Sequence, residues 1–461
     1  MRTDKASFSN RAIFFLICAA VVVFTMFYGT VHQPAIALFY LTVTAMWLFW
    51  AWDSFRTGSF TISRHLLQVP LFAAALFAFV QMIPFGWRDD AAGVAGVGRT
   101  LTMSPFDTQM TMLHMLALAL FFSVVLTSVS SAARLSKLVT FISVFGFVYA
   151  FFAILQSFLS PGKIYGIYER AGASPFGTFV SRHNFAAFAE MTLALPLGML
   201  LSGAVKRDKK LLYITAIVLI GTALLMSGSR GGLVAMAAAV MLLIFLTTRA
   251  KGYKAIAVRG VLAVLLVAVV VAGTIYIGGE SSLTRIAETA TSKDVTTDRL
   301  HIWKTTLKVI NANFPLGAGI GAFAQAYTQF DDRGGLERVE QAHNDYLQVL
   351  ADAGIVGAAI LAVFLWALYK TVRRALKEKN GFRRGAAVGA IGGIFAVLVH
   401  SVFDFVLHTT AITVMFILLL VILIASARSY TDDIEDDENA RHRHRTKGIV
   451  TAFGRRRSAS R

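Results

Sequence analysis

The chain has 461 residues, of which 56% are hydrophobic and 15% are charged, with a formal net charge of +18 and a single cysteine. A soluble domain usually carries about 25% charged residues, whereas the apolar residues here form runs near 20 residues, the length that a helix needs to cross a bilayer. The basic residues lie between these runs and not on one folded face with a readable motif, which argues against nucleic-acid binding, and the lone Cys18 excludes a disulfide framework, a Cys-ligated zinc site and an iron–sulfur cluster.

We expect an all-α, polytopic membrane bundle of about twelve transmembrane helices in residues 1–430. The expected spans are 12–29, 34–52, 66–84, 110–129, 137–158, 184–204, 211–227, 231–247, 257–278, 346–369, 385–407 and 411–427. The first is interpreted as a retained span and not a signal peptide, because no convincing small-residue cleavage site follows it. The charged tail at 431–461 is predicted to be disordered and cytoplasmic.

Basic residues alternate between the ends of successive spans, as the positive-inside rule predicts for short cytoplasmic loops. The inward segments and both termini hold 31 of the 44 Lys and Arg residues, including the dense run from Lys370 to Arg384. The other 13 lie outward, and seven of them are in one long loop, where the rule is weak. We therefore expect both termini on the cytoplasmic side.

The outward segment 279–345 is too long for a structureless connector and is a functional candidate. Within it, Asp298 to Asn311 has apolar residues at helical spacing and predicts a short amphipathic helix. Pro315 and the glycines after it end this helix. The loop has seven basic and nine acidic residues, so its charges nearly cancel and it is not a nucleic-acid surface.

Two motifs at the predicted outer face contain arginine. The first is S-G-S-R-G-G at 227–232, where Arg230 is either a functional charge at the hydrocarbon edge or part of a tight turn with its side chain among the headgroups. The second is Asp298-Arg299 at the start of the amphipathic helix, where an anion would meet a guanidinium and free backbone N–H groups. Taken alone, Arg299 would be interpreted as an ordinary surface arginine.

A third motif, A-H-N-D-Y-L-Q at 342–348, lies where the long loop re-enters the membrane. His343 is expected near the start of a helix, where polar neighbours can orient its ring and set its tautomer. A lone interfacial histidine is more often structural. The crowding of Asn344, Asp345 and Gln348 at the head of an apolar helix nevertheless favours a functional role.

The loop before the sixth span is a candidate substrate site. It runs from Tyr168 to Asn184 and combines aromatic residues with Arg170, Arg182 and His183. These side chains suit a sugar or a phosphate, and they suit a structured interface loop equally well.

Together, these motifs resemble the O-antigen ligase/polymerase family. The resemblance rests on S-G-S-R-G-G, on D-R-x-x-x-W in the outer loop, on A-H-N-D-Y-L-Q followed by G-x-x-G, and on S-R-H-N-F-A-A-F-A-E-M at 181–191. It covers about residues 160–370 by motif and nearly the whole chain by architecture. Each motif is short, and it is their order and shared outer-face placement that make the match specific.

The resemblance implies a GT-C-like membrane fold that moves a glycan from a polyprenyl (undecaprenyl) diphosphate carrier to a glycan or lipid-core acceptor. The expected place is the outer face of a bacterial inner membrane, among membrane lipids, without nucleotide sugar, cofactor or metal. It assigns the functional arginines to Arg230 and Arg299 and the functional histidine to His343. The residues that we expect to bind substrate are Arg170, Arg182, His183, Asn184, Asn344 and Tyr346.

Residue chemistry agrees with this implication. A lipid diphosphate that leaves as the glycosidic bond breaks needs positive charge, and the arginine fork pairs with phosphate oxygens bidentately. Each such charge-assisted bond contributes about 1.5–3 kcal/mol. An imidazole such as that of His343 can take the proton of the acceptor hydroxyl or only position it, and both roles stay open. The outer loops contain no Asp-x-Asp metal motif, which fits a mechanism without a metal.

Two other classes compete with a transferase, whose ligase and polymerase forms differ only in the acceptor. A twelve-span transporter or lipid-linked glycan flippase would place polar residues at mid-membrane and show repeats, whereas the mid-span candidates here are few and no repeat is found. They are His114, Glu190, His400 and Asp404. A membrane scaffold without catalysis is the third class.

Overall fold

The computed structural model describes residues 7–60, 62–84, 100–169, 174–248, 297–332 and 338–428, and four single residues between 257 and 264. Apart from two isolated β-bridges, these residues form helices and loops. The helices are α1 (Phe8–Met26), α2 (Gln33–Thr57), α3 (Val69–Met82), α4 (Pro105–Ser128), α5 (Ala132–Leu159), α6 (Arg182–Leu201), α7 (Lys210–Met226), α8 (Arg230–Thr247), α10 (Thr297–Ala312), α11 (Phe323–Thr328), α12 (Asp345–Ala375), α13 (Gly381–His400) and α14 (Thr410–Ser426).

The all-α membrane architecture predicted from the sequence is confirmed. Within the described part of the chain, nine helices are long and apolar enough to cross a membrane, and Leu66–Met82 and Thr410–Ser426 are shorter apolar helices. These eleven segments coincide with eleven of the twelve predicted spans. Apart from the four residues between 257 and 264, the remaining predicted span, 257–278, lies outside the described residues, as does the tail from residue 431.

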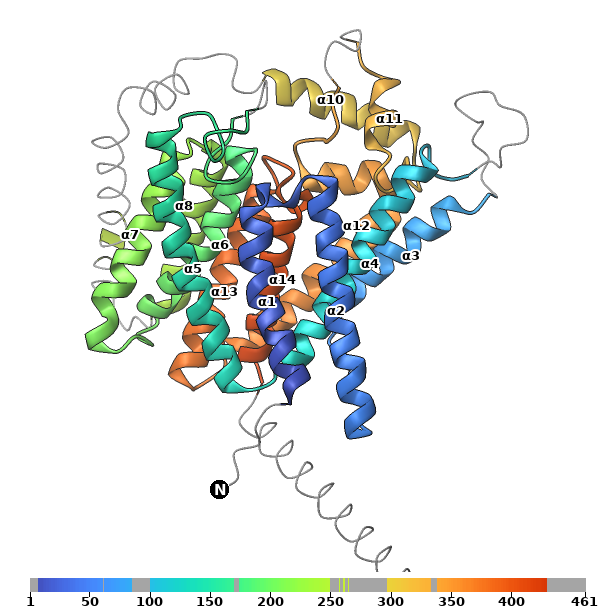
Figure 1. Ribbon diagram of the computed structural model, residues 1–461. Coiled ribbons are helices and arrows are strands. Elements are labelled where there is room, and N and C mark those ends of the chain that lie inside the picture. Colours follow the sequence, from blue (N-terminus) through green and yellow to red (C-terminus); the bar gives the residue numbers. More distant parts are fainter. Residues whose placement is uncertain are drawn as a thin grey trace, which may run out of the picture.

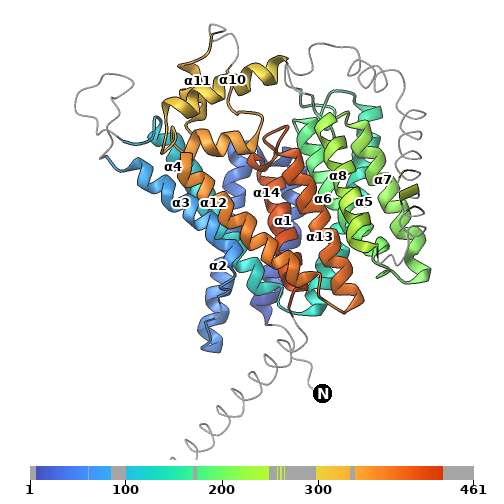
Figure 2. The same cartoon turned by 180° about the vertical axis from the view of Figure 1, so that it is seen from behind.

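The centre of the bundle consists of α6, α13 and α14, and the other long helices surround them (Figures 1 and 2). In the most apolar 18-residue stretch of α6, 89% is buried inside the protein, whereas in the corresponding stretch of α2 only 28% is buried. Glycines bring α6 and α13 close together, because a Cβ at Gly198 would lie only 2.3 Å from Gly389 Cα. Such small residues are what allow helix backbones to approach closely in a membrane bundle.

The two ends of the bundle differ in what they carry (Figure 1). We call the end that bears α10 and α11 the upper rim; it includes the loops 159–169, 174–181, 227–229 and 401–409. The opposite end is the lower rim, where α1 begins and α14 ends. The basic connections gather there, among them the loop 202–209 and the loop 376–380 with the helix ends beside it.

A break in α12 shapes the upper rim. Gly354 has φ 54° and ψ −137°, and a side chain there would overlap Pro315. Because of this break, the first part of α12 lies across the upper rim and the rest crosses the bundle beside α13 and α14 (Figures 1 and 2). The glycines after α10 pack against the same turn, since a Cβ at Gly317 would lie 2.4 Å from Asp352 C. The predicted amphipathic helix is α10, and Pro315 and the glycines that follow it do end it.

Candidate functional site

Asp404 joins three side chains that come from three distant parts of the chain. Its Oδ1 lies 3.0 Å from His343 Nδ1, and its Oδ2 accepts a hydrogen bond of 3.1 Å from Arg299 Nη2. The Nδ1 of His183 is 3.7 Å from the same Oδ2. One carboxylate at the upper rim therefore gathers a guanidinium and two imidazoles.

The loop that follows α13 holds Asp404 in place. The backbone N–H of Asp404 donates to His400 O (3.0 Å), and Phe405 N–H donates to Asp404 Oδ1 (3.0 Å). Burial by itself would raise the pKa of the Asp404 carboxyl, which is 4% exposed. The hydrogen bond from His343 and the nearby His183 and Arg299 together outweigh burial and lower this pKa, so Asp404 is an anion at neutral pH.

His343 is positioned by the start of α12. Asn344 caps this helix by accepting hydrogen bonds from two backbone N–H groups of its first turn, and its Nδ2 donates to Val402 O (3.0 Å). The backbone N–H of Asp345 donates to Ser401 O (2.9 Å). His343 itself has φ 49°, a conformation that non-glycine residues seldom adopt. These contacts fasten the histidine segment to the loop that carries Asp404.

The contact with Asp404 decides what His343 can do. When Nδ1–H donates to the carboxylate, the ring is held as the tautomer whose Nε2 is a hydrogen-bond acceptor. The side chain is 34% exposed, so a ligand can reach it. The edge-to-face packing of the ring on Phe405, with centroids 4.8 Å apart, fixes its plane. The arrangement is that of an oriented base or positioning group.

Arg299 lies in the first turn of α10, as predicted. The helix packs on α11 and the start of α12 through a small buried cluster that contains Val309, Phe323, Tyr327 and Ala351. The Arg299 side chain is 30% exposed. Since Nη2 alone contacts Asp404, the other N–H groups of the guanidinium remain suitable for an anionic ligand.

The S-G-S-R turn lies in the same place. Ser229 caps α8 by accepting from Gly232 N–H (3.2 Å), and its Oγ lies 2.9 Å from His183 Nδ1. Arg230 is the first residue of α8, and Arg182 begins α6 with its Nη1 4.0 Å from the position of a Cβ at Gly228. The starts of α6 and α8 thus bring two arginines to the rim beside His183.

A fully buried histidine–glutamate pair packs against this turn. His400 Nδ1 is 2.9 Å from Glu190 Oε1, and both side chains have no exposed surface. The remaining polar atoms, Glu190 Oε2 and His400 Nε2, have no hydrogen-bond partner among the described residues. A Cβ at Gly231 would lie 3.2 Å from His400 Nε2, and one at Gly232 would lie 3.0 Å from Glu190 Oε1. The two glycines therefore let α8 pack against this pair.

A second histidine–carboxylate pair flanks the site. His408 Nδ1 lies 3.1 Å from Asp345 Oδ1, and its ring, like that of His343, packs edge to face against Phe405, with centroids 6.3 Å apart. Burial would lower the pKa of His408, but the hydrogen bond to Asp345 and the charges of Asp345 and Asp352 outweigh it and raise this pKa. The pair links the start of α12 to the short 3₁₀ helix Val406–His408.

The residues predicted to bind substrate have different surroundings. His183 is part of the Asp404 cluster, and Arg182 is beside it. Asn184 is buried and donates to Thr409 Oγ1 (2.7 Å), and Tyr346 OH donates to Leu398 O (2.7 Å). These two side chains, like that of Asn344, hold elements of the protein together. Arg170 lies outside the described residues.

Asp404 and Ser229 are the two members of this network to which the sequence assigned no role. Ser229 stood inside a motif chosen for its arginine and glycines, although a serine before a helix start is a capping signal. Asp404 was noticed as one of the few charged residues near a span and was interpreted only as a possible transport residue. A carboxylate at a membrane edge tends to have a partner, but nothing in the sequence indicates which one.

The described residues contain one His and Asp cluster with the spacing of a metal site. His301 Nε2 lies 3.4 Å from Asp332 Oδ1 and 3.9 Å from Asp331 Oδ1. Lys308 Nζ, 3.9 Å from Asp332 Oδ2, already supplies a positive charge there. The cluster belongs to α10, which also carries Arg299, and to the segment after α11.

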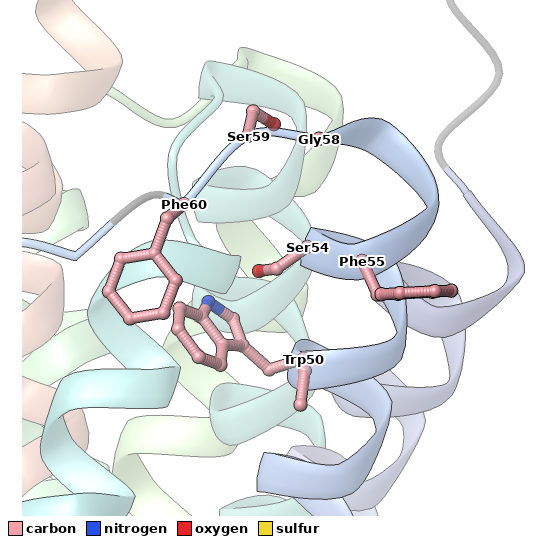
Figure 3. A pocket seen from close by; sticks show the side chains of 7 residues that line it. Trp50, Ser54, Phe55, Gly58, Ser59 and Phe60 are labelled. Atoms are coloured by element: carbon pink, nitrogen blue, oxygen red, sulfur yellow. The ribbon is translucent and has the colours of Figure 1, made fainter.

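A hollow of about 340 Å³ lies elsewhere, at the lower end of α2 (Figure 3). Trp50 and Phe60 line it in edge-to-face contact, with ring centroids 4.7 Å apart, and Phe55 extends in another direction from the same helix. Its lining contains no charged or titratable side chain. The hollow can hold an apolar group but cannot perform acid–base or phosphate chemistry.

Comparison with known proteins identifies the middle of the chain. A family model described as O-Antigen ligase matches residues 215–362, about a third of the chain, and this confirms the resemblance seen in the motifs. No curated protein matches the chain. The matched segment contains Arg230, Arg299 and His343, whereas His183 and Asp404 lie outside it. Residues 215–362 of this multi-pass membrane protein therefore match the O-antigen ligase family, and this match supports a role in membrane glycan transfer.

Proposed function

We propose that the protein transfers a glycan from a polyprenyl diphosphate carrier to the hydroxyl of a glycan or lipid-core acceptor, as an O-antigen or exopolysaccharide ligase or polymerase. The observation that carries this proposal is the meeting of Arg299 and His343 on the buried carboxylate of Asp404. A transferase that breaks a sugar–diphosphate bond needs these two functions side by side: a cation for the leaving group and an oriented imidazole for the acceptor.

The chemistry follows from these positions. The acceptor hydroxyl oxygen attacks the anomeric carbon of the donor sugar, and the bond from that carbon to the diphosphate oxygen breaks. The electron pair leaves with the polyprenyl diphosphate, whose charge Arg299 and Arg230 stabilise through charge-assisted hydrogen bonds. His343 Nε2 accepts the hydrogen bond of the hydroxyl, and Asp404 keeps the ring in the tautomer that can do so. The hydroxyl proton passes to Nε2 when the ring acts as a base, and to the departing diphosphate when the ring only positions the acceptor.

We place the upper rim at the outer face of a bacterial inner membrane and both termini in the cytoplasm. The lower rim supports this orientation, because its loops are the basic ones and basic loops stay on the cytoplasmic side. A lipid carrier would then bring its diphosphate to the upper rim while its chain remains among the helices. In this proposal residues 1–430 are the catalytic bundle and 431–461 are a separate cytoplasmic tail.

The test is a transfer assay with purified protein, the lipid-linked glycan pool of producing cells and an acceptor fraction from cells that lack the protein. Arg299→Ala and His343→Ala should each lower the rate by at least about 100-fold, the contribution expected of a transition-state donor or a general base. Arg338→Ala is the matched control, because this arginine is 74% exposed and pairs only with exposed Glu340 among the described residues.

Two outcomes would overturn the proposal. Normal transfer by both variants would remove the catalytic assignment. Movement of intact lipid-linked glycan across vesicles, with no transfer by the wild-type protein, would indicate a flippase instead. A variant in which His343 is replaced by Gln distinguishes the two roles of the ring, since Gln can position a hydroxyl but cannot accept its proton at neutral pH.

A further inference from the structure

Four aromatic rings lie together on the upper rim, outside the Asp404 network. Two come from the connection between α1 and α2, and two come from the loop after α5. We call this cluster the aromatic platform; it consists of Tyr28, His32, Tyr165 and Tyr168. The Tyr28 centroid lies 4.8 Å from that of Tyr168, 5.4 Å from that of His32 and 5.9 Å from that of Tyr165. Tyr165 is exposed and the other three are half-buried, so the platform is both anchored and accessible.

The backbone of the platform is strained. In the part of the chain that the structure describes, four non-glycine residues have positive φ: Tyr28 (53°), Thr30 (60°), Tyr165 (56°) and His343 (49°). Residues in this conformation cost free energy and gather at ligand-binding sites. Specific bonds hold them here, since Thr30 Oγ1 donates to Phe24 O (2.9 Å) and Tyr165 OH donates to Met26 O. Three of the four strained residues thus lie in or next to the platform, and the fourth is the proposed catalytic histidine.

The backbone beside the platform packs against the loop that carries Asp404. A Cβ at Gly29 would lie 2.5 Å from Phe179 Cδ1 and 3.4 Å from Thr409 Cγ2. Thr409 is the last residue of the loop 401–409, which also carries Asp404. The connection between α1 and α2 is therefore packed directly against the segment that carries the proposed catalytic carboxylate.

The chemistry of the platform matches a sugar. Aromatic rings pack on the apolar faces of sugars, and tyrosine hydroxyls and ring nitrogens bond to sugar hydroxyls. Partial burial of its hydroxyl, together with the nearby Tyr28, raises the pKa of Tyr165 to about 12, so its phenol stays neutral. His32 Nε2 is buried and has no hydrogen-bond partner among the described residues, so the ring brings an unsatisfied polar atom to the platform.

We propose that the aromatic platform is a glycan-binding subsite, which holds sugar rings beyond the one that is transferred. This inference deepens the proposed function and rests on it, because the glycan is the one whose linkage the Asp404 network would make or break. The platform lies entirely outside residues 215–362. Donor and acceptor can both present such a glycan, so the shared chemistry is an oligosaccharide chain.

The first experiment measures binding without turnover. The probe is the oligosaccharide released by mild acid from the lipid-linked glycan of producing cells, titrated into protein in nanodiscs and followed by saturation-transfer NMR. Tyr168→Ala should weaken binding about tenfold, which corresponds to roughly 1.4 kcal/mol, and Tyr168→Phe should retain most of it because the ring remains. Tyr369→Ala, an exposed tyrosine toward the lower rim, should bind like the wild type. His32→Ala serves as a second variant, since neither its φ nor that of Tyr168 is strained.

The second experiment separates the two sources of the glycan. In the transfer assay, Tyr168→Ala should raise the KM of one substrate and leave kcat nearly unchanged, and the affected substrate, donor or acceptor, identifies the bound chain. Unchanged oligosaccharide affinity in both Tyr168→Ala and His32→Ala overturns the subsite, and a loss of membrane anchoring instead assigns the rings to lipid headgroups. Because binding is measured without transfer, the binding result remains valid even if the His343→Ala variant transfers glycan normally.

Discussion

The two rims of the bundle use charge differently. At the upper rim, two carboxylates are buried and paired: Asp404 with Arg299 and His343, and Asp345 with His408. At the lower rim most basic side chains are exposed, as in the run from Lys206 to Lys210. Buried, paired charge at a membrane edge is costly and typical of a functional site, whereas exposed basic charge sets the orientation of spans. The contrast indicates which rim performs chemistry.

The largest effect is expected from a substitution of Asp404, the residue at the centre of the upper-rim network. Asp404→Asn should lower the transfer rate by about 10³–10⁴-fold. Without the negative charge, residue 404 no longer fixes the tautomer of His343 or the position of Arg299. The same transfer assay measures it. Asp208→Asn, the same change at an exposed position of the lower rim, should have no measurable effect, and equal losses in the two variants would contradict the distinction between the rims.

The next effect concerns stability beneath the site. Glu190→Leu leaves His400 buried without its partner and should cost about 3–5 kcal/mol, as the breaking of buried ion pairs does. Denaturant unfolding in detergent measures this cost. Glu190→Leu combined with His400→Leu should recover much of it, since an apolar pair needs no charge compensation. If the double variant is less stable than the single one, the pair is not coupled as described.

Alanine substitutions at two glycines test how tightly each rim is packed. Gly232→Ala should destabilise the protein by about 1–3 kcal/mol, because the new Cβ would lie 2.7 Å from Ala186 Cβ. Gly381→Ala at the lower rim should stabilise it by about 0.4–1 kcal/mol, because the position is helical and no atom lies within 4 Å of the new Cβ. Thermal unfolding of both variants measures the difference, and a reversed order would refute the tight packing assigned to the upper rim.

The smallest effect is a pH dependence. A histidine whose pKa is raised in the folded protein stabilises it below the unfolded pKa of about 6.5, and this contribution is lost as the pH rises through the folded value. The pairing of His408 with Asp345 should therefore make the protein slightly more stable at pH 6 than at pH 8. His408→Gln should reduce that difference in melting temperature, and an unaltered pH profile would show that the pair contributes nothing.

Much of this structure follows from local patterns in the sequence. Apolar runs predicted the spans, helical spacing predicted α10, and the polar crowding around His343 indicated the start of α12. The meeting of Arg299 and His343 on Asp404 could not be predicted in this way, because it depends on the break at Gly354 and on the loop after α13. Local periodicity contains no information about which loops meet. The roles of Asn184 and Tyr346 as links between elements had no sequence signal for the same reason.

The boundaries of the family region have a practical consequence. Residues 215–362 supply Arg230, Arg299 and His343, but the carboxylate that orients two of them comes from residue 404. A chimera that exchanges only the matched segment between two such proteins would graft the side chains without their anchor. We expect working hybrids to need α6 and the loop 401–409 from the same parent, so recombination or engineering within this architecture has to treat three separate stretches of chain as one inherited unit.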